Sequence, residues 1–147
     1  MKAAIYFKKL DERAIVPTYG SQYSAGADLY AITDEDVTIE PGKTYLFHTY
    51  LSMEIPEGFG GFIFARSGLA SKKGLAPANK VGVVDADYRG EIMVALHNHS
   101  DIPQIISSGE RIAQLVIMPF LAAEFVECDE LSQTVRGEGG FGSTGTK

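Results

Sequence analysis

The sequence predicts an all-β fold, a jelly-roll-like β-barrel that carries one short helix and a flexible Gly-rich C-terminal tail. Its 147 residues with 45% hydrophobic content suit one globular domain with a real core. Sixteen glycines, six prolines and 10% aromatic residues favour strands and turns over long helices. Short alternating segments also follow one another at regular spacing, which is typical of a β-sandwich or barrel.

The clearest strand predicted by this alternation runs from Tyr45 to Ile55. The odd-numbered side chains of this segment share one face and the even-numbered ones the other. Pro41-Gly42 and Pro56-Glu57-Gly58 mark turns at its two ends. We expect further strands over residues 3–8, 37–40, 59–65, 80–84, 91–97, 102–106, 111–118 and 122–128, and one short helix over 68–73.

The last residues differ from the rest, so we divide the chain into a β-barrel domain, 1–135, and a mobile tail, 136–147. The tail contains a literal G-x-G-x-x-G at Gly137, Gly139 and Gly142. A dinucleotide-binding site would need a strand before this pattern and a helix after it, and the chain ends five residues later. Two interpretations remain: a solubilising tail, or a phosphate cradle of backbone N–H groups with Arg136, Ser143 and Thr144.

Composition limits the compartment and the partners. Cys128 is the only cysteine, so no internal disulfide can form and a reducing cytoplasm is expected. The net charge of −6 makes nucleic acid an unfavourable partner. No apolar run approaches the roughly 18 residues that a membrane span needs. A small phosphorylated ligand stays possible, because local cations can overrule the global charge.

The segment 81–90 is the strongest candidate for chemistry. An apolar strand ends there in Asp85, Asp87, Tyr88, Arg89 and Gly90. A carboxylate held at the mouth of a rigid hairpin is well placed to act as a general base. The alternative is a plain hairpin turn with Asx hydrogen bonds.

Three other segments each allow a functional and a structural interpretation. Arg66-Ser67-Gly68 would form an anion site beside a helix N-terminus, or Ser67 would simply cap that helix. Asp28 would help to hold Mg²⁺, or would be an exposed turn residue. Gln114 lies within an apolar strand, so its amide must face a ligand or bond to backbone.

Two further candidates are weak. His97 and His99 share one face of a strand, but a zinc site needs three or four ligands and the chain has one cysteine. Cys128 has no nearby group that would lower its pKa and make it a nucleophile.

Taken together, five segments resemble the motifs of the homotrimeric deoxyuridine triphosphatase (dUTPase) family. They are 25–30, 66–68, 79–90, 109–115 and 136–145, and they occur in the family's order across nearly the whole chain. Each motif alone is weak evidence, whereas five in order are specific. The chain departs from the family at Ala65, where many members have Pro, and at Ala78, where some have Gly. Neither position supplies a functional side chain.

The resemblance implies a jelly-roll-like barrel that hydrolyses dUTP to dUMP and pyrophosphate with Mg²⁺. It implies that Asp85 activates the attacking water, that Tyr88 excludes a 2′-hydroxyl, and that Asp28 holds the metal ion, largely through water. The uracil would be read by the hairpin that contains Asn79 and Gly82. Phosphate contacts would come from Arg66, Ser67, Gly68 and Gln114, and the tail would add Arg136, Phe141, Gly142, Ser143 and Thr144. A homotrimer with sites at subunit interfaces is likewise implied.

Two alternatives stay open. A deoxycytidine triphosphate deaminase relative would share the barrel and an Arg-Ser motif, but it lacks the Asp-x-Asp-Tyr hairpin that this chain has. A regulatory binding protein would use the same fold to grip a partner and can keep the catalytic motifs.

Overall fold

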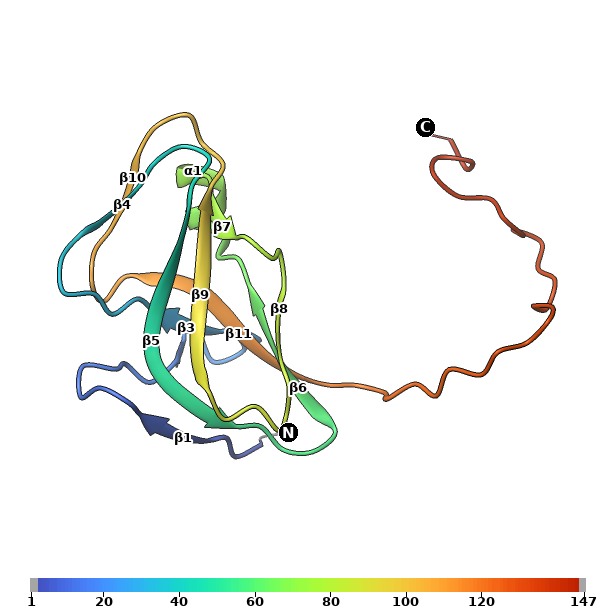
Figure 1. Cartoon of the computed structure of the whole chain (residues 1–147), viewed down its shortest axis with the longest axis horizontal. Coiled ribbons are helices and arrows are strands. Elements are labelled where there is room, and N and C mark those ends of the chain that lie inside the picture. Colours follow the sequence, from blue (N-terminus) through green and yellow to red (C-terminus); the bar gives the residue numbers. More distant parts are fainter. Residues whose placement is uncertain (1–2, 146–147) are drawn as a thin grey trace.

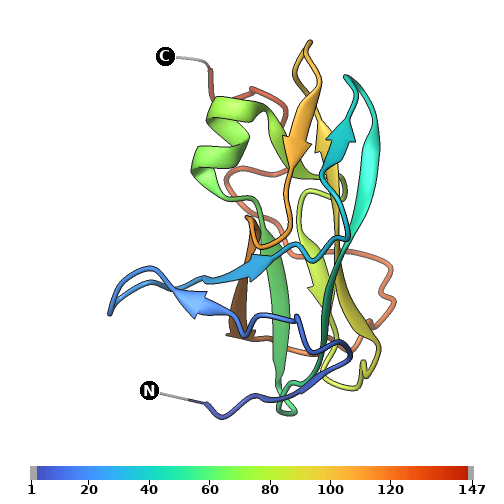
Figure 2. The ribbon, with the colours of Figure 1, turned by 90° about the vertical axis from the view of Figure 1, so that its left-hand side faces the viewer.

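Two antiparallel sheets of a computed structural model, which describes residues 3–145, enclose one hydrophobic core (Figures 1 and 2). The four-stranded sheet has the order β1 (Tyr6–Lys9), β5 (Thr44–Glu54), β9 (Glu91–Asn98) and β7 (Leu75–Pro77). The five-stranded sheet has the order β2 (Thr18–Tyr19), β3 (Ala27–Tyr30), β11 (Arg111–Pro119), β6 (Phe59–Phe64) and β8 (Gly82–Val84). A third pair joins β10 (Gln104–Ile106) to β4 (Val37–Ile39), and α1 (Ser67–Lys73) follows β6. The all-β, jelly-roll-like expectation is confirmed.

The core forms because alternate residues of the central strands point inward. On β9, Ile92, Val94 and Leu96 are buried while their neighbours are half-buried. On β5 the odd-numbered side chains, predicted to share one face, are buried from Phe47 onward, but Tyr45 is 42% exposed. Full burial of one such aliphatic or aromatic side chain contributes about 1.5–3 kcal/mol, so these two strands supply much of the stability.

Asn98 is a polar exception inside this core. Its Nδ2 donates to the carbonyl oxygens of Ile39 and Ile102, each at 2.8 Å. Its Oδ1 accepts from the backbone N–H and the hydroxyl of Ser100. Because every polar atom has a partner, this buried amide costs little and ties the end of β9 to the β4–β10 pair.

The predicted strand boundaries agree with the structure to within a few residues, with one exception. The strand predicted over 122–128 is wrong: regular structure ends at Pro119, and residues 120–145 form neither helix nor strand. Figure 1 shows this segment leaving the end of β11 and running away from the sheets. It therefore finds no neighbouring strand in its own chain with which to pair.

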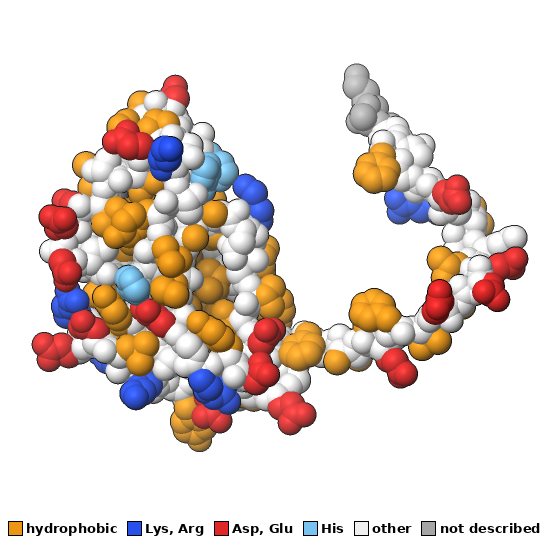
Figure 3. Space-filling model, in the orientation of Figure 1, with side chains coloured by type: hydrophobic (Ala, Val, Ile, Leu, Met, Phe, Trp, Pro, Cys, Tyr) orange, Lys and Arg blue, Asp and Glu red, His pale blue; other side chains and the backbone are white. Residues whose placement is uncertain are grey.

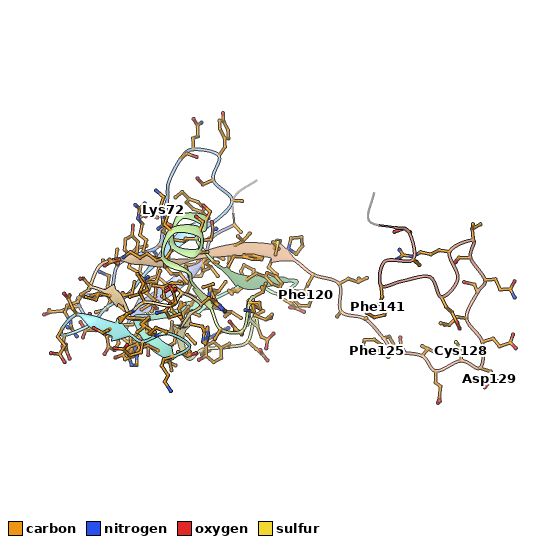
Figure 4. The ribbon with its side chains drawn as sticks, turned by 90° about the horizontal axis from the view of Figure 1, so that it is seen from above. Lys72, Phe120, Phe125, Cys128, Asp129 and Phe141 are labelled. Carbon is orange, nitrogen blue, oxygen red and sulfur yellow. The ribbon has the colours of Figure 1, made fainter. Side chains whose placement is uncertain are left out.

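Apolar side chains lie exposed along this segment (Figures 3 and 4). Leu121, Phe125, Leu131 and Phe141 are each more than four-fifths exposed.

The short helix predicted from the sequence is confirmed as α1. Within residues 3–145, no helix has both the length and the apolar character required to span a bilayer.

Candidate active site

Strand register brings three predicted segments to one place. Gln114 on β11 pairs with Asp28 on β3 on one side and with Phe64 on β6 on the other. Directly paired residues point their side chains to the same face of a sheet, so these three side chains lie in a row. Arg66 follows Phe64 by two residues and has an extended backbone, so its side chain points to the same face as that of Phe64.

An open cavity of about 420 Å³ lies over this row. It contains five of the predicted site residues, Asp28, Arg66, Ser67, Gly68 and Gln114, together with Arg111. Two guanidinium groups, a hydroxyl and an amide therefore face one space, and such donors suit a ligand with several anionic oxygens.

Asp28 is the anchor of this cavity. It is only 8% exposed, which excludes the interpretation as an exposed turn residue. Its Oδ1 accepts a hydrogen bond of 2.8 Å from Arg66 Nε, and its Oδ2 lies 3.4 Å from Arg111 Nη1. The carboxylate thus holds two arginines beside each other against their mutual repulsion and leaves them with surplus positive charge.

Ser67 does not cap the helix. The N-cap residue of α1 is Arg66, and no side chain bonds to the first turn of that helix. The interpretation of Ser67 as a capping residue is therefore wrong. Its hydroxyl is exposed at the cavity instead.

Gln114 bonds to backbone and also lines the cavity. Its Nε2 donates to the carbonyl of Ala65 at 2.9 Å. The chain passes close to it at Gly26, where an added Cβ would lie 3.1 Å from Gln114 Cβ and 3.0 Å from Cδ. Gly26 is therefore required so that the segment 25–30 can approach the side-chain amide of Gln114.

The residues of the hairpin lie elsewhere. Val84 pairs with Gly61, at the far end of β6 from Arg66. Arg66 follows Gly61 by five residues, which is about 16 Å at the rise of a strand. Asp85 follows Val84, and neither it nor Asn79, Gly82 or Tyr88 lines the cavity.

The hairpin is nevertheless well ordered by its own contacts. The backbone N–H of Tyr88 donates to the carbonyl of Asp85 at 3.1 Å. Gly82 is buried, and a Cβ there would lie 3.2 Å from Ile63 Cβ and 3.4 Å from Asn79 Nδ2. Arg89 donates to the carbonyl oxygens of Ala86 and Tyr88 and lies 3.8 Å from Glu54.

The predicted tail residues lie apart from both regions. Arg136 Nε donates to the carbonyl of Gly139 at 2.8 Å. Phe141 is fully exposed, and Figure 4 shows it on the part of the segment that stands away from the sheets. Gly142, Ser143 and Thr144 follow in turns of the same exposed segment.

Arg111 is the cavity residue that the sequence did not reveal. Residues 111 and 114 would face opposite sides of a regular strand. A bulge between Arg111 and Ala113 shifts the register, and both side chains reach the same cavity. The feature of the sequence that could have indicated this role is the position of Arg111 at the start of a strand, directly after Gly109-Glu110.

The other predicted metal and nucleophile candidates gain no support. Across residues 3–145 there is no group of three His, Cys, Asp or Glu side chains that would hold a metal ion. His97 and His99 contact each other edge to face, and desolvation, then Lys80 and His97, hold the pKa of His99 below its ordinary value. Cys128 is exposed on the extended segment.

Comparison with known proteins identifies the family. The dUTPase family model matches residues 12–145 of this chain. The chain belongs to the dUTPase family. A deoxyuridine 5′-triphosphate nucleotidohydrolase of Desulfitobacterium hafniense is 49% identical over 146 residues, which cover 99% of this chain and 97% of that protein. One of Hydrogenobaculum sp. is 51% identical over 95% of this chain and 96% of its own length.

Solved dUTPase structures share the fold. The dUTPase of Staphylococcus bacteriophage 80alpha with dUPNHPP has a TM-score of 0.88 and 30% identity, covering 98% of this chain and 99% of that one. A mutant dUTPase from phage phi11 of S. aureus, described with a structural Mg(II) ion, has a TM-score of 0.76 and 27% identity over 87% of this chain and 98% of its own. These dUTPases favour the hydrolase over the deaminase alternative.

Proposed function

We propose that this chain hydrolyses dUTP to dUMP and pyrophosphate by attack of water on the α-phosphorus. The observation that carries the proposal is the cavity where Arg66, Arg111, Ser67 and Gln114 converge beside Asp28. Such donors offset the charge that develops on departing phosphates. In the cell, this reaction would lower dUTP and supply dUMP for thymidylate synthesis.

The site residues divide into four groups by what each would do. Asp85 would orient and deprotonate the water, since a weak nucleophile needs a carboxylate base. Uracil and sugar would be selected by the hairpin through Asn79, Gly82 and Tyr88. The triphosphate would be bound by Arg66, Ser67, Gly68 and Gln114, with Arg136, Phe141, Gly142, Ser143 and Thr144 closing over the nucleotide as a lid of residues 136–147. Desolvation under that lid would strengthen each electrostatic contact.

We further propose a homotrimer in which each site is shared between subunits. The separation along β6 supports it: five residues, about 16 Å of strand, lie between Arg66 and Gly61, which pairs with Val84 beside Asp85. The base and the arginines of one site would then come from different chains. The apolar side chains exposed along residues 120–145 also need a surface to cover them. A neighbouring copy of the body would offer one.

Asp28 is suited to a water-mediated contact with Mg²⁺ rather than to a metal site built from protein ligands alone. Both of its oxygens already accept from arginines, and the described residues offer no cluster of three ligands. Mg²⁺ commonly keeps several waters and is bound through one or two carboxylates plus substrate phosphates. Asp28 would therefore contact, through water, an ion held by the triphosphate. That ion supplies positive charge to the phosphates.

The test is a pyrophosphate-release assay with dUTP, dCTP, dTTP and UTP at equal concentrations. We expect turnover of dUTP well above that of the other three, because buried hydrogen bonds reject cytosine and steric limits reject the thymine methyl and the ribose hydroxyl. Ammonia release from dCTP would instead support the deaminase. No turnover of any nucleotide would support the regulatory binding protein.

We also propose a cytoplasmic location, supported by the single Cys128, and a small-molecule substrate as the principal partner. The net charge of −6 disfavours nucleic acid.

A further inference from the structure

The ring of Tyr88 folds back over its own chain at Gly90. A Cβ added at Gly90 would lie 2.5 Å from Tyr88 Cζ and 2.8 Å from Cε2, distances that real Cβ atoms do not show. Gly90 has no positive φ, so glycine is not needed there for backbone freedom. It is needed because the ring occupies the space of a side chain.

One hydrogen bond then fixes the ring. The hydroxyl of Tyr88 donates to the carbonyl oxygen of Glu91 at 2.9 Å. Tyr88 is 43% exposed, so packing alone does not hold its ring in place. Its orientation depends on the space above Gly90 and on the position of Glu91.

Glu91 is anchored in turn by an irregularity in the neighbouring strand. His48 pairs with Met93 and Ser52 with Glu91, so three residues of β5, 49–51, face the single Ile92. Within this bulge Tyr50 has φ 53, a left-handed conformation that costs a residue with a Cβ about 1–2 kcal/mol. Such conformations persist only where the surroundings enforce them.

The carboxylate of Glu91 supplies that enforcement. Its Oε1 accepts the N–H of Tyr50 at 2.8 Å, and its Oε2 lies 2.9 Å from His48 Nδ1. The His48 ring stacks on the Tyr50 ring with 4.9 Å between centroids. The Glu91 side chain is only 15% exposed, whereas that of His48 is 46% exposed, so it is mainly the hydrogen bond from the Tyr50 N–H to the carboxylate that is shielded from water.

We propose that Glu91 and Gly90 are positioning residues that fix the ring of Tyr88 and thereby set the preference for 2′-deoxynucleotides over ribonucleotides. The inference rests on the proposed role of Tyr88 as the group that excludes a 2′-hydroxyl. Neither positioning residue would need to contact the substrate. The bulge holds Glu91, Glu91 holds the hydroxyl of Tyr88, and Gly90 leaves room for the ring.

The experiment compares kcat/KM for dUTP with kcat/KM for UTP in the full chain. Tyr88→Phe removes only the anchoring hydroxyl, and Gly90→Ala displaces the ring. We expect each to lower the dUTP:UTP ratio by about five- to tenfold, the value of one lost hydrogen bond, mainly through faster use of UTP. Glu91→Ala should act in the same direction, and Glu91→Gln, which keeps an oxygen for the Tyr50 N–H, should restore most of the ratio.

Two controls separate this effect from general damage. Tyr45→Phe removes a hydroxyl from a tyrosine of nearly equal exposure, 42%, and should leave the ratio unchanged. Tyr88→Leu removes the ring itself and should lower the ratio most. Because Gly90 and Tyr88 lie on an exposed hairpin, their variants keep the test valid even where Glu91→Ala fails to fold.

The outcomes are distinguishable. If Tyr88→Leu lowers the ratio while Tyr88→Phe and Gly90→Ala match the wild type, the positioning inference is overturned and the role of Tyr88 stands. If Tyr88→Leu also leaves the ratio unchanged, both the role of Tyr88 and the inference built on it are overturned. The proposal that the wild type hydrolyses dUTP does not depend on either result.

Discussion

Arg66 Nε and Asp28 Oδ1 lie 2.8 Å apart, and this ion pair joins the end of β6 to β3 across the intervening strand β11. The carboxylate is 11% exposed at its side chain and the guanidinium 27%. The pair is therefore partly desolvated, and its loss would leave two arginines facing each other.

Asp28→Asn should weaken both stability and phosphate binding. Removing one partner of a largely buried pair costs about 3 kcal/mol, and the misplaced arginines should raise KM for dUTP. Urea denaturation and steady-state kinetics measure the two effects. Asp34→Asn, which removes a 91% exposed partner of Arg13, is the control and should change neither. A stable Asp28→Asn protein with normal KM would contradict the anchoring role.

Asp85→Asn should fold normally and lose most of its turnover. Asp85 is exposed, so the substitution disturbs no packing, while loss of a general base lowers kcat by about 10²–10⁴-fold. Rapid-quench or steady-state pyrophosphate release measures it. Asp87→Asn, two residues along the same exposed turn, is the matched control and should keep most activity. Equal losses in the two variants would refute the assignment of Asp85.

Deleting residues 136–147 should abolish activity without changing the melting curve. The described part of this segment is almost wholly exposed and contributes no strand to the body, so little packing is lost. Differential scanning calorimetry and dUTP turnover are compared with the full chain. Phe141→Ala, a single deletion of one ring, should mainly raise KM. A fall of several degrees in Tm after truncation would show a structural tail instead.

Mixing two inactive chains should restore activity if sites are shared. Asp85→Asn chains retain the arginines and the tail, and chains lacking 136–147 retain Asp85. Within a mixed oligomer some sites would receive an intact base from one chain and an intact tail from another. Refolding the two together and assaying dUTP turnover tests this. Activity no higher than the sum of the separate variants would place each site within one chain.

The acid stability of the body should depend on Asp11. Hydrogen bonds from the Arg13 side chain and backbone lower the Asp11 pKa from 3.8 to about 2. A depressed folded-state pKa stabilises the fold above pH 3.8, and the contribution is lost as pH falls through about 2. Asp11→Asn should therefore lower the urea midpoint at pH 5 and approach the wild type near pH 2. Glu12→Gln is the neighbouring control. A constant difference at every pH would contradict the linkage.

Much of the β-barrel could be predicted from alternation, because the side chains of a strand that face the core occur at every second position. From Phe47 to Ile55 the odd-numbered side chains, which alternation places on one face, are all buried. The rule fails where the strand is irregular. The bulge before Ala113 brings Arg111 to the side of Gln114, and the bulge at Tyr50 anchors Glu91. Both bulges interrupt the two-residue alternation of a strand, and no pattern in the sequence marks where they occur.

The remaining errors have other physical causes. Residues 122–128 are mostly apolar, but a strand requires a partner, and the described sheets offer none there. Ser67 resembles an N-cap residue by type, yet the helix begins one residue earlier than such a cap would require. The proximity of Asp28 to Gln114 depends on the register of β3 against β11, which involves residues far apart in sequence.

The order of the elements along the chain has a consequence for biosynthesis. The last strand, β11, is also the middle strand of the five-stranded sheet, so that sheet cannot close until residues 111–119 have been made. The segment with Arg136 and Phe141 contributes no strand, so the sheets can close without waiting for it.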